Sequence, residues 1–532
     1  MNNDYEPRGR RLPAGSHEPV KSHEPVVTLG IVWKFFSLSV AFLLMVVCCG
    51  WGRSRWCYSQ EPGLVREVVK DFFVRQDCNS SNCHGAALDV GGVGGRGELG
   101  YGSEIWKQAG EIWFQRDPHS SAYVGLLSQE SYRIVRALWP SGDSEVPASP
   151  KDPRYEAFLE AKCVACHASE FSPRSQRTLG VDCQSCHGLA SAWGEGHYSQ
   201  DWKAKGELRF EDETAKGRVC MPNIWVLANS CTACHVGDLG RDREIRDEGG
   251  VTVQLGVREV THDLMAAGHP PTYFELGNYL ARYPKHWDTP SIPGEDGSDA
   301  ALDTWRVGKL VSAQRRLELL KERIQQGVVM ELTEYRCTSC HHRLEKADGL
   351  VGQPEWDGWY LEQVDVALML SDELVVGGEI SDPEAGLARW RRGREELQRL
   401  MCGGESLWSE KRREEILRSC DEMLGVLDRV VENRAALKIP SDWSEIDRRL
   451  LEKRTRASWE SSVQLQQVLR SIALKRGVEE AKDVRGVYQP SWGLGQQQWR
   501  RGEQMPFAGS ARHPRDISDW LEQIAETLKQ KP

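Results

Sequence analysis

The chain has 532 residues, with 68 lysines and arginines against 78 aspartates and glutamates, a formal net charge of -10 and 40% hydrophobic residues. This length and composition indicate a globular protein with room for two or three domains, and they exclude disorder or a collagen-like repeat for most of the chain. The acidic balance argues against a nucleic-acid partner, because such binding relies on positive charge. The sixteen cysteines are the most informative residues, since most of them stand in close pairs.

The amino terminus predicts a membrane segment. Residues 1–27 are polar and basic, and they are expected to form a flexible leader. Residues 28–50 contain the apolar run Thr28–Cys49, which is long enough to span a bilayer and is interrupted only by Lys34 near its start. No small-residue cleavage site follows, so an uncleaved anchor is favoured over a cleaved signal peptide. With the basic leader inside, the rest of the chain is expected on the periplasmic or equivalent exported side, anchored in the inner membrane by this single helix.

Five motifs end in a Cys-His pair. Four have the spacing C-x-x-C-H, and a fifth, the first along the chain, has the longer spacing C-x4-C-H. They are Cys78 to Cys83-His84, Cys163-Val-Ala-Cys166-His167, Cys183-Gln-Ser-Cys186-His187, Cys231-Thr-Ala-Cys234-His235 and Cys337-Thr-Ser-Cys340-His341. C-x-x-C-H is the attachment signature of c-type haem, because two thiols one helical turn apart form thioethers and the adjacent histidine binds the iron. From composition alone, roughly 0.013 matches to C-x-x-C-H are expected in a chain of this length, so four matches do not arise by chance. Together with the longer first motif, they favour five covalent haems c.

Two alternatives to haem attachment compete for these cysteines. The pairs from Cys163 to Cys186 also fit the spacing of a zinc ribbon. Zinc requires no histidine after each second cysteine, however, and every pair here has one. For Cys78 and Cys83, whose spacing is the least regular, the alternative is an ordinary disulfide. We therefore interpret all five motifs as haem sites.

The second axial position of each iron decides between an electron carrier and a site that binds a small molecule. Three histidines, His17, His23 and His513, lie before the membrane segment or near the carboxyl end and are set aside. Six other histidines lie outside the motifs among the haem sites, which is close to the number that five irons need: His119, His197, His262, His269, His286 and His342. We favour His119, His197 and His269 most. His342 follows a proximal ligand directly, so it is expected to serve only a neighbouring haem.

Three runs of sequence resemble the multihaem cytochrome c-554 family over roughly residues 70–345. They are Asp117-Pro-His-Ser-Ser-Ala-Tyr123, Gly180-Val-Asp-Cys183-Gln-Ser-Cys186-His-Gly188 and Thr261-His-Asp-Leu-Met-Ala-Ala-Gly-His-Pro270. The chain departs from the family in its C-x4-C-H motif, in the short spacing between His167 and His187, and in having a fifth motif.

The resemblance implies a set of axial partners. His197 is expected to serve the iron of His84, and His119 the iron of His187. Either His269 or His262 is expected to serve the iron of His235. The haem on His167 is then expected to be five-coordinate, with no protein ligand on its distal side, and it is the candidate catalytic position.

The expected fold is mainly α. About 53 residues per haem, over the 265 residues from Cys78 to His342, are too few for a separate core around each haem. Residues 70–345 are therefore expected to form a multihaem cytochrome c domain with short helices and long irregular loops packed around haems. Residues 350–532 are expected to form a helical C-terminal region. The apolar periodicity predicts helices over residues 304–326, 384–401, 410–433 and 444–475.

Together these features predict a membrane-anchored, exported multihaem cytochrome that relays electrons between redox partner proteins, or from a quinol-linked donor. The alternative is a haem enzyme that reduces or oxidises a small nitrogen or sulfur species at one open haem. A zinc-stabilised scaffold is a third interpretation, from another functional class. Outside the motifs, Cys402 and Cys420 are expected to form a disulfide or to remain buried thiols.

Overall fold

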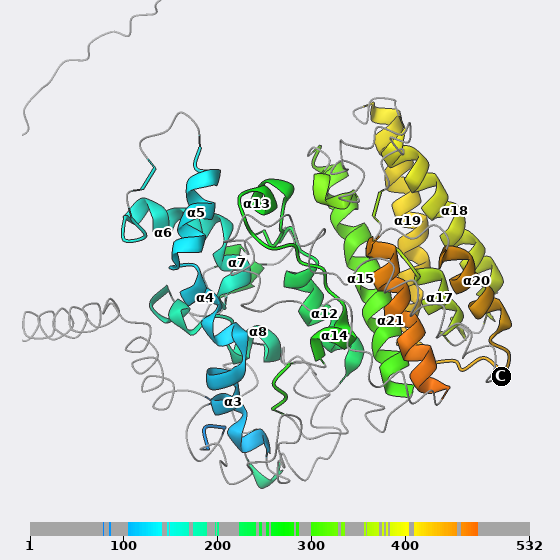
Figure 1. Ribbon diagram of the computed structural model, residues 1–532, viewed down its shortest axis with the longest axis horizontal. Coiled ribbons are helices and arrows are strands. Elements are labelled where there is room, and N and C mark those ends of the chain that lie inside the picture. Colours follow the sequence, from blue (N-terminus) through cyan, green and yellow to red (C-terminus); the bar gives the residue numbers. More distant parts are fainter. Residues whose placement is uncertain are drawn as a thin grey trace, which may run out of the picture. The chain divides into compact units, whose positions relative to one another are not determined.

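The computed structural model describes part of the chain between residues 78 and 476 (Figure 1). The described residues are 78, 84–86, 105–140, 146–147, 149–169, 174–188, 197, 199–201, 223–240, 244–246, 252–254, 257–280, 283–286, 299–327, 331–335, 356–357, 359–371, 375–376, 379–380, 383–403, 409–454 and 459–476. The predicted membrane segment at 28–50, Cys83, the motif from Cys337 to His341, and His342 lie outside them. Residues 72–532 belong to one compact unit.

The amino-terminal half of the described chain consists of short helices joined by irregular segments. In order these are η1 (Ile105–Gln108), α3 (Ala109–Arg116), η2 (Pro118–Ser121), α4 (Ala122–Gly125), α5 (Gln129–Leu138), α6 (Pro153–Lys162), α7 (Val164–His167), η3 (Arg174–Leu179), α8 (Cys183–His187), α12 (Ile224–His235), the hairpin of β1 (Glu244–Arg246) and β2 (Thr252–Gln254), α13 (His262–Ala266) and α14 (Leu276–Leu280). Short polar residues fix where several of them begin, because the side chains of Asp152, Asp182 and Asn223 accept hydrogen bonds from the first backbone N–H groups of α6, α8 and α12.

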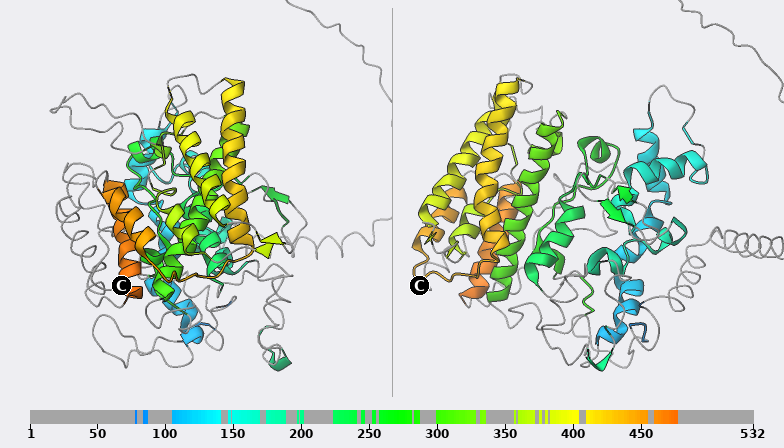
Figure 2. Two further views of the ribbon diagram at one scale, coloured as in Figure 1. Left: turned by 90° about the vertical axis from the view of Figure 1, so that its right-hand side faces the viewer. Right: turned by 180° about the vertical axis from the view of Figure 1, so that it is seen from behind.

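Long helices dominate the carboxyl-terminal half and lie side by side in Figures 1 and 2. The elements are α15 (Asp299–Gln325), η4 (Leu332–Glu334), α17 (Val364–Met369), the hairpin of β3 (Val375–Val376) and β4 (Glu379–Ile380), α18 (Pro383–Cys402), α19 (Glu410–Glu432), α20 (Ser444–Arg454) and α21 (Trp459–Lys475). The mainly α class is thus confirmed for the described residues. The four predicted helical ranges are confirmed too, except that 444–475 contains two helices instead of one.

One hydrophobic core joins the two halves. It runs from Ile224 on α12 to Ala473 on α21, with Trp305, Leu317 and Trp390 buried inside it. α15 lies at its centre, since α12, α14, α17, α19 and α21 all pack against this helix. The core therefore crosses the boundary expected near residues 345–350. A separate small cluster around Tyr155 and Leu159 holds α4, α5, α6 and α7 together.

Two further expectations concern membrane crossing and cysteine pairing. No helix among the described residues is both long enough and apolar enough to cross a membrane. Cys402 and Cys420 are not joined in a disulfide, and burial raises the pKa of the Cys420 thiol. Of the two expected alternatives, a disulfide or two thiols, the structure therefore shows two thiols.

Gly308 on α15 allows this helix to approach α14 closely. A Cβ at this position would lie 2.5 Å from the Cβ of Leu276, a backbone-proximal atom that cannot swing away. We expect Gly308→Ala to lower the free energy of unfolding by about 1–3 kcal/mol, as overpacked cores do. Gly425→Ala on α19 is the matched control, because a Cβ there meets nothing within 4 Å, and it is expected to raise stability by about 0.5–1 kcal/mol. Urea denaturation of both variants checks the pair, and equal shifts in the same direction would contradict it.

Candidate functional site

The second, third and fourth cysteine motifs are helical. Within the second motif, the backbone N–H groups of Cys166 and His167 both donate to the carbonyl of Cys163, at 3.1 and 3.2 Å. The third motif is the whole of α8 and the fourth ends α12. This one-turn geometry places each pair of thiols on neighbouring turns with the histidine directly after them. In the first motif the His84 N–H donates to the Cys78 carbonyl at 3.2 Å.

Each of the four described motif histidines faces a second histidine. The ring centroids are 6.4 Å apart for His84 and His197, 6.3 Å for His167 and His269, 6.2 Å for His187 and His286, and 6.1 Å for His235 and His119. The ring planes are parallel to within 3° in the first pair and cross at 68° to 83° in the others. The spacing is therefore nearly constant although the four pairs come from different parts of the chain.

This spacing fits one metal ion between each pair of rings. Imidazole nitrogens bind metals at about 2 Å, and two rings that bind one ion from opposite sides have centroids about 6 Å apart. A haem iron takes two axial ligands, which is the number each pair supplies. The described residues thus fit haem ligation at four motifs. Among these residues no group of three or more His, Cys, Asp or Glu side chains gathers as a cage for a bare metal ion.

Hydrogen bonds at Nδ1 orient several of these rings. Nδ1 of His84 lies 2.8 Å from the carbonyl of Trp106, Nδ1 of His167 lies 3.0 Å from that of Ala122, and Nδ1 of His269 lies 2.7 Å from that of Pro270. A carbonyl only accepts, so Nδ1 carries the proton in each case. Nε2 is then the deprotonated nitrogen that binds a metal.

His119 has a different partner, because its Nδ1 lies 2.8 Å from Oδ1 of the Asp117 carboxylate. Asp117 is buried, and burial raises its pKa. The hydrogen bond and the charge of His119 outweigh that effect, so the net pKa of Asp117 is lowered. The sequence analysis missed this carboxylate, although it stands two residues before His119 in the Asp-Pro-His run.

Burial also favours the neutral form of four of these imidazoles, whereas at His119 the hydrogen bond and charge of Asp117 outweigh burial and raise the pKa. Desolvation, together with the charges of nearby histidines, lowers the pKa of His235 to about 3 and that of His269 to about 4. Desolvation likewise lowers the pKa of His167 and His286. Neutral imidazole is the form that binds a metal, so these side chains are available as ligands at neutral pH.

The pairing agrees with the expected partners at one position and differs at the others. His197 lies opposite His84, as the resemblance implies. His119 lies opposite His235 instead of His187, and His286 takes the place beside His187. His269 lies opposite His167, where an open distal side was expected. A long-range contact contributes to this, because Arg258 donates to the Ala165 carbonyl at 2.9 Å and so fixes the segment that leads to His269 against α7.

Two of the candidate histidines are not in these pairs. His262 begins α13, and its backbone N–H donates to the Glu331 carboxylate at 2.7 Å. Glu331 is six residues before Cys337 in the sequence. His342, like the motif that it follows, lies outside the described residues.

The cysteines of neighbouring motifs influence one another's pKa. A hydrogen bond with the Cys234 side chain, and then burial, raises the pKa of the Cys166 thiol. Burial and then the charge of Cys231 raise the pKa of Cys186, and burial and then Cys78 raise that of Cys183. Tyr283, which the sequence analysis also missed, has its ring centroid 6.1 Å from both His119 and His286. These interactions link the motif of His84 to that of His187, the motif of His187 to that of His235, and the motif of His235 to that of His167, which is not their order in the sequence.

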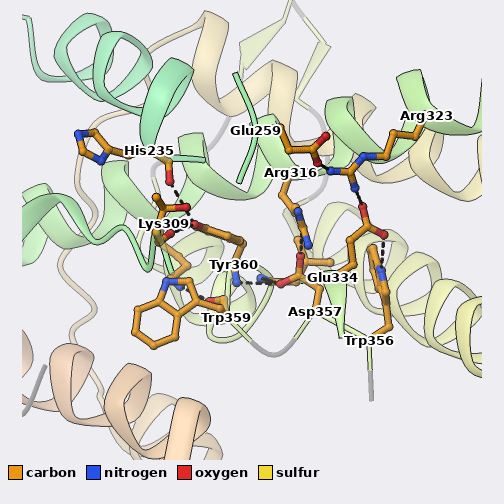
Figure 3. A network of polar contacts seen from close by, with 12 residues as sticks. His235, Glu259, Lys309, Arg316, Arg323, Glu334, Trp356, Asp357, Trp359 and Tyr360 are labelled. Atoms are coloured by element: carbon orange, nitrogen blue, oxygen red, sulfur yellow. Dashed lines mark hydrogen bonds and ion pairs between the residues drawn. The ribbon is translucent and has the colours of Figure 1, made fainter. Parts of the chain in front are cut away.

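A buried polar network joins the His235 pair to α15 (Figure 3). The Tyr360 hydroxyl donates to the Thr272 carbonyl at 2.6 Å and lies 3.4 Å from the carbonyl of His235. The backbone N–H of Tyr360 donates to Asp357, whose other oxygen accepts from Arg316 at 2.8 Å. The last residue of the fourth motif is thus connected to the central helix of the core.

A scan against protein-family models finds no match for this chain, and searches of curated proteins and of solved structures find none either.

Proposed function

We propose that this chain is a membrane-anchored, exported multihaem c-type cytochrome that relays electrons between redox partners through five covalently bound haems. The observation that carries the proposal is the facing of every described motif histidine by a second histidine at 6.1 to 6.4 Å. Structural histidines in a protein core have no reason to repeat one ring spacing at four motifs. Two axial ligands of a single iron require that spacing.

The chain's own residues hold and orient the proposed cofactors. The motif cysteines supply the thioether positions, and the paired imidazoles supply both axial ligands. Backbone carbonyls fix the tautomer of His84, His167 and His269. When bound, haem iron supplies reversible one-electron transfer. We expect electrons to pass between neighbouring sites.

The alternative function, an enzyme with an open haem on His167, has less support. The ring of His269 faces His167 at 6.3 Å, on the side where a small substrate would bind. A site with both axial positions filled by protein is suited to outer-sphere electron transfer. A carrier is therefore the function that the described residues favour.

The irregular first motif gives a direct test of haem attachment. We expect the intact mass of protein matured with a haem-attachment system to correspond to five haems, and Cys83→Ser to lower the count to four because one thioether position is lost. Cys402→Ser, outside every motif, is the control and should leave five. An unchanged count of five in the Cys83→Ser protein would remove this motif from the proposal, whereas a wild-type mass without any haem would overturn the proposal itself.

A further inference from the structure

The Asp117 carboxylate is held against His119 by two hydrogen bonds to one oxygen. Asp117 is the N-cap of η2, and its Oδ1 accepts from the His119 backbone N–H at 2.9 Å and from the His119 Nδ1 at 2.8 Å. The Asp117 side chain is only 1% exposed. Its negative charge is thus buried and directed at the ring that faces His235.

A hydrogen bond with Val181 fixes the turn that carries Asp117 and His119. The Val181 backbone N–H donates to the His119 carbonyl at 3.0 Å, and Trp113 donates through its ring N–H to the Val181 carbonyl at 3.0 Å. Gly180 adopts a φ of +68°, and a Cβ there would collide with the His119 carbonyl. The carboxylate and the imidazole therefore cannot drift apart without moving the segment that leads into α8.

A carboxylate partner changes the chemistry of a ligating imidazole. The described Nδ1 partners of His84, His167 and His269 are neutral backbone carbonyls, whereas that of His119 is an anion. A charge-assisted hydrogen bond is the stronger of the two and draws the Nδ1 proton toward the carboxylate. The ring then becomes a more basic and more electron-donating ligand.

We propose that Asp117 is a positioning residue for electron transfer, which gives His119 anionic character and makes the centre of His235 and His119 the hardest to reduce of the four. The inference rests on the proposed function, since it concerns a haem iron between these two rings. Electron donation from the ligand and the buried negative charge both stabilise ferric over ferrous iron. The reduction potentials of the four sites therefore differ because the Nδ1 partners of their histidines differ, although each site has two histidine ligands.

The test is a potentiometric titration of the whole protein, followed by electron paramagnetic resonance of the low-spin ferric signals. Asp117→Asn retains a capping oxygen and removes the charge. We expect it to make one centre easier to reduce by about tenfold in the reduction equilibrium, which is about 59 mV for one electron. The g values of the same signal should move, because they respond to the donor strength of the axial ring. The variant His119→Met identifies which signal belongs to this centre.

Asp182→Asn is the matched control. Asp182 is also a buried carboxylate beside a motif, but its described hydrogen bonds cap α8 at the N–H groups of Gln184 and Ser185. We expect this variant to leave the potential of the His235 centre unchanged. Unchanged potentials in Asp117→Asn, or a larger shift in another centre than in the one marked by His119→Met, would overturn the inference.

Further outcomes distinguish a failure of this inference from a failure of the proposed function. If Asp117→Asn fails to fold, the wild-type titration decides, because the signal marked by His119→Met must be the last of the four to be reduced. If the wild-type protein has no haem signal at all, the proposed function fails and the role of Asp117 fails with it. A haem-bearing protein in which the marked centre is reduced first contradicts the role of Asp117 alone.

Discussion

Replacing His269 with alanine is expected to open the centre of His167. In the wild-type protein the two rings face each other at 6.3 Å, so the proposed iron has an imidazole on each side and is low-spin. Without the His269 ring one axial position loses its protein ligand. We expect about one high-spin ferric centre per chain in the electron paramagnetic resonance spectrum, and a Soret band that shifts when cyanide is added.

His513→Ala is the control for this experiment, because this histidine is near the carboxyl end and is not among the candidate ligands. It should leave the spectrum unchanged. A wild-type protein that already has a cyanide-sensitive high-spin centre, which His269→Ala does not alter, would restore the open haem on His167 and with it the enzyme alternative. Comparison of His269→Ala with its control thus decides between the carrier and the enzyme.

The largest loss of stability is expected from Glu334→Ala. Arg323 on α15 is buried between the carboxylates of Glu334 and Glu259, and Glu334 also accepts from the Trp356 ring N–H at 3.0 Å (Figure 3). Removing one partner of a buried ion pair leaves a charge without compensation, which costs about 3–5 kcal/mol. Because Glu259 remains beside Arg323, we expect a loss at the lower end, about 3 kcal/mol, measured by urea denaturation with far-ultraviolet circular dichroism.

A surface pair provides the comparison for that loss. Arg399 and Glu396 form an ion pair on α18 in which the side chains are 63% and 40% exposed. Exposed pairs contribute roughly 0–1 kcal/mol, so Glu396→Ala is expected to change the unfolding free energy by less than about 1 kcal/mol. Similar losses in the two variants would contradict the expectation that the buried Glu334–Arg323 pair contributes more to stability than the exposed Glu396–Arg399 pair.

The helices were predictable from the sequence because their signals are local. Apolar residues at three- and four-residue spacing indicated α15, α18 and α19 to within a few residues of their ends. The break between α20 and α21 was missed, since the periodicity continues across it. The core that spans residues on both sides of 345–350 was not predictable, because Trp305 and Leu317 join it through contacts that no local pattern records.

The ligand pairs show the same limit. The motif histidines could be identified from spacing alone, but their partners depend on how distant segments are fixed. The contact of Arg258 with Ala165 directs His269 to His167, and the contact of Val181 with His119 fixes the turn that faces His235. Each contact joins residues more than sixty positions apart. Four of the six candidate histidines lie opposite motif histidines, and most of them face a different partner from the one expected.

The central claim is that paired histidines hold low-spin haem irons, and electron paramagnetic resonance of the purified ferric protein with a quantitative spin count tests it most directly. The account predicts low-spin ferric haem signals for the His84, His187, His235 and His167 centres in every chain, with none of the four altered by cyanide. A protein without ferric haem signals, or one in which the His167 centre is high-spin and binds cyanide, would contradict it.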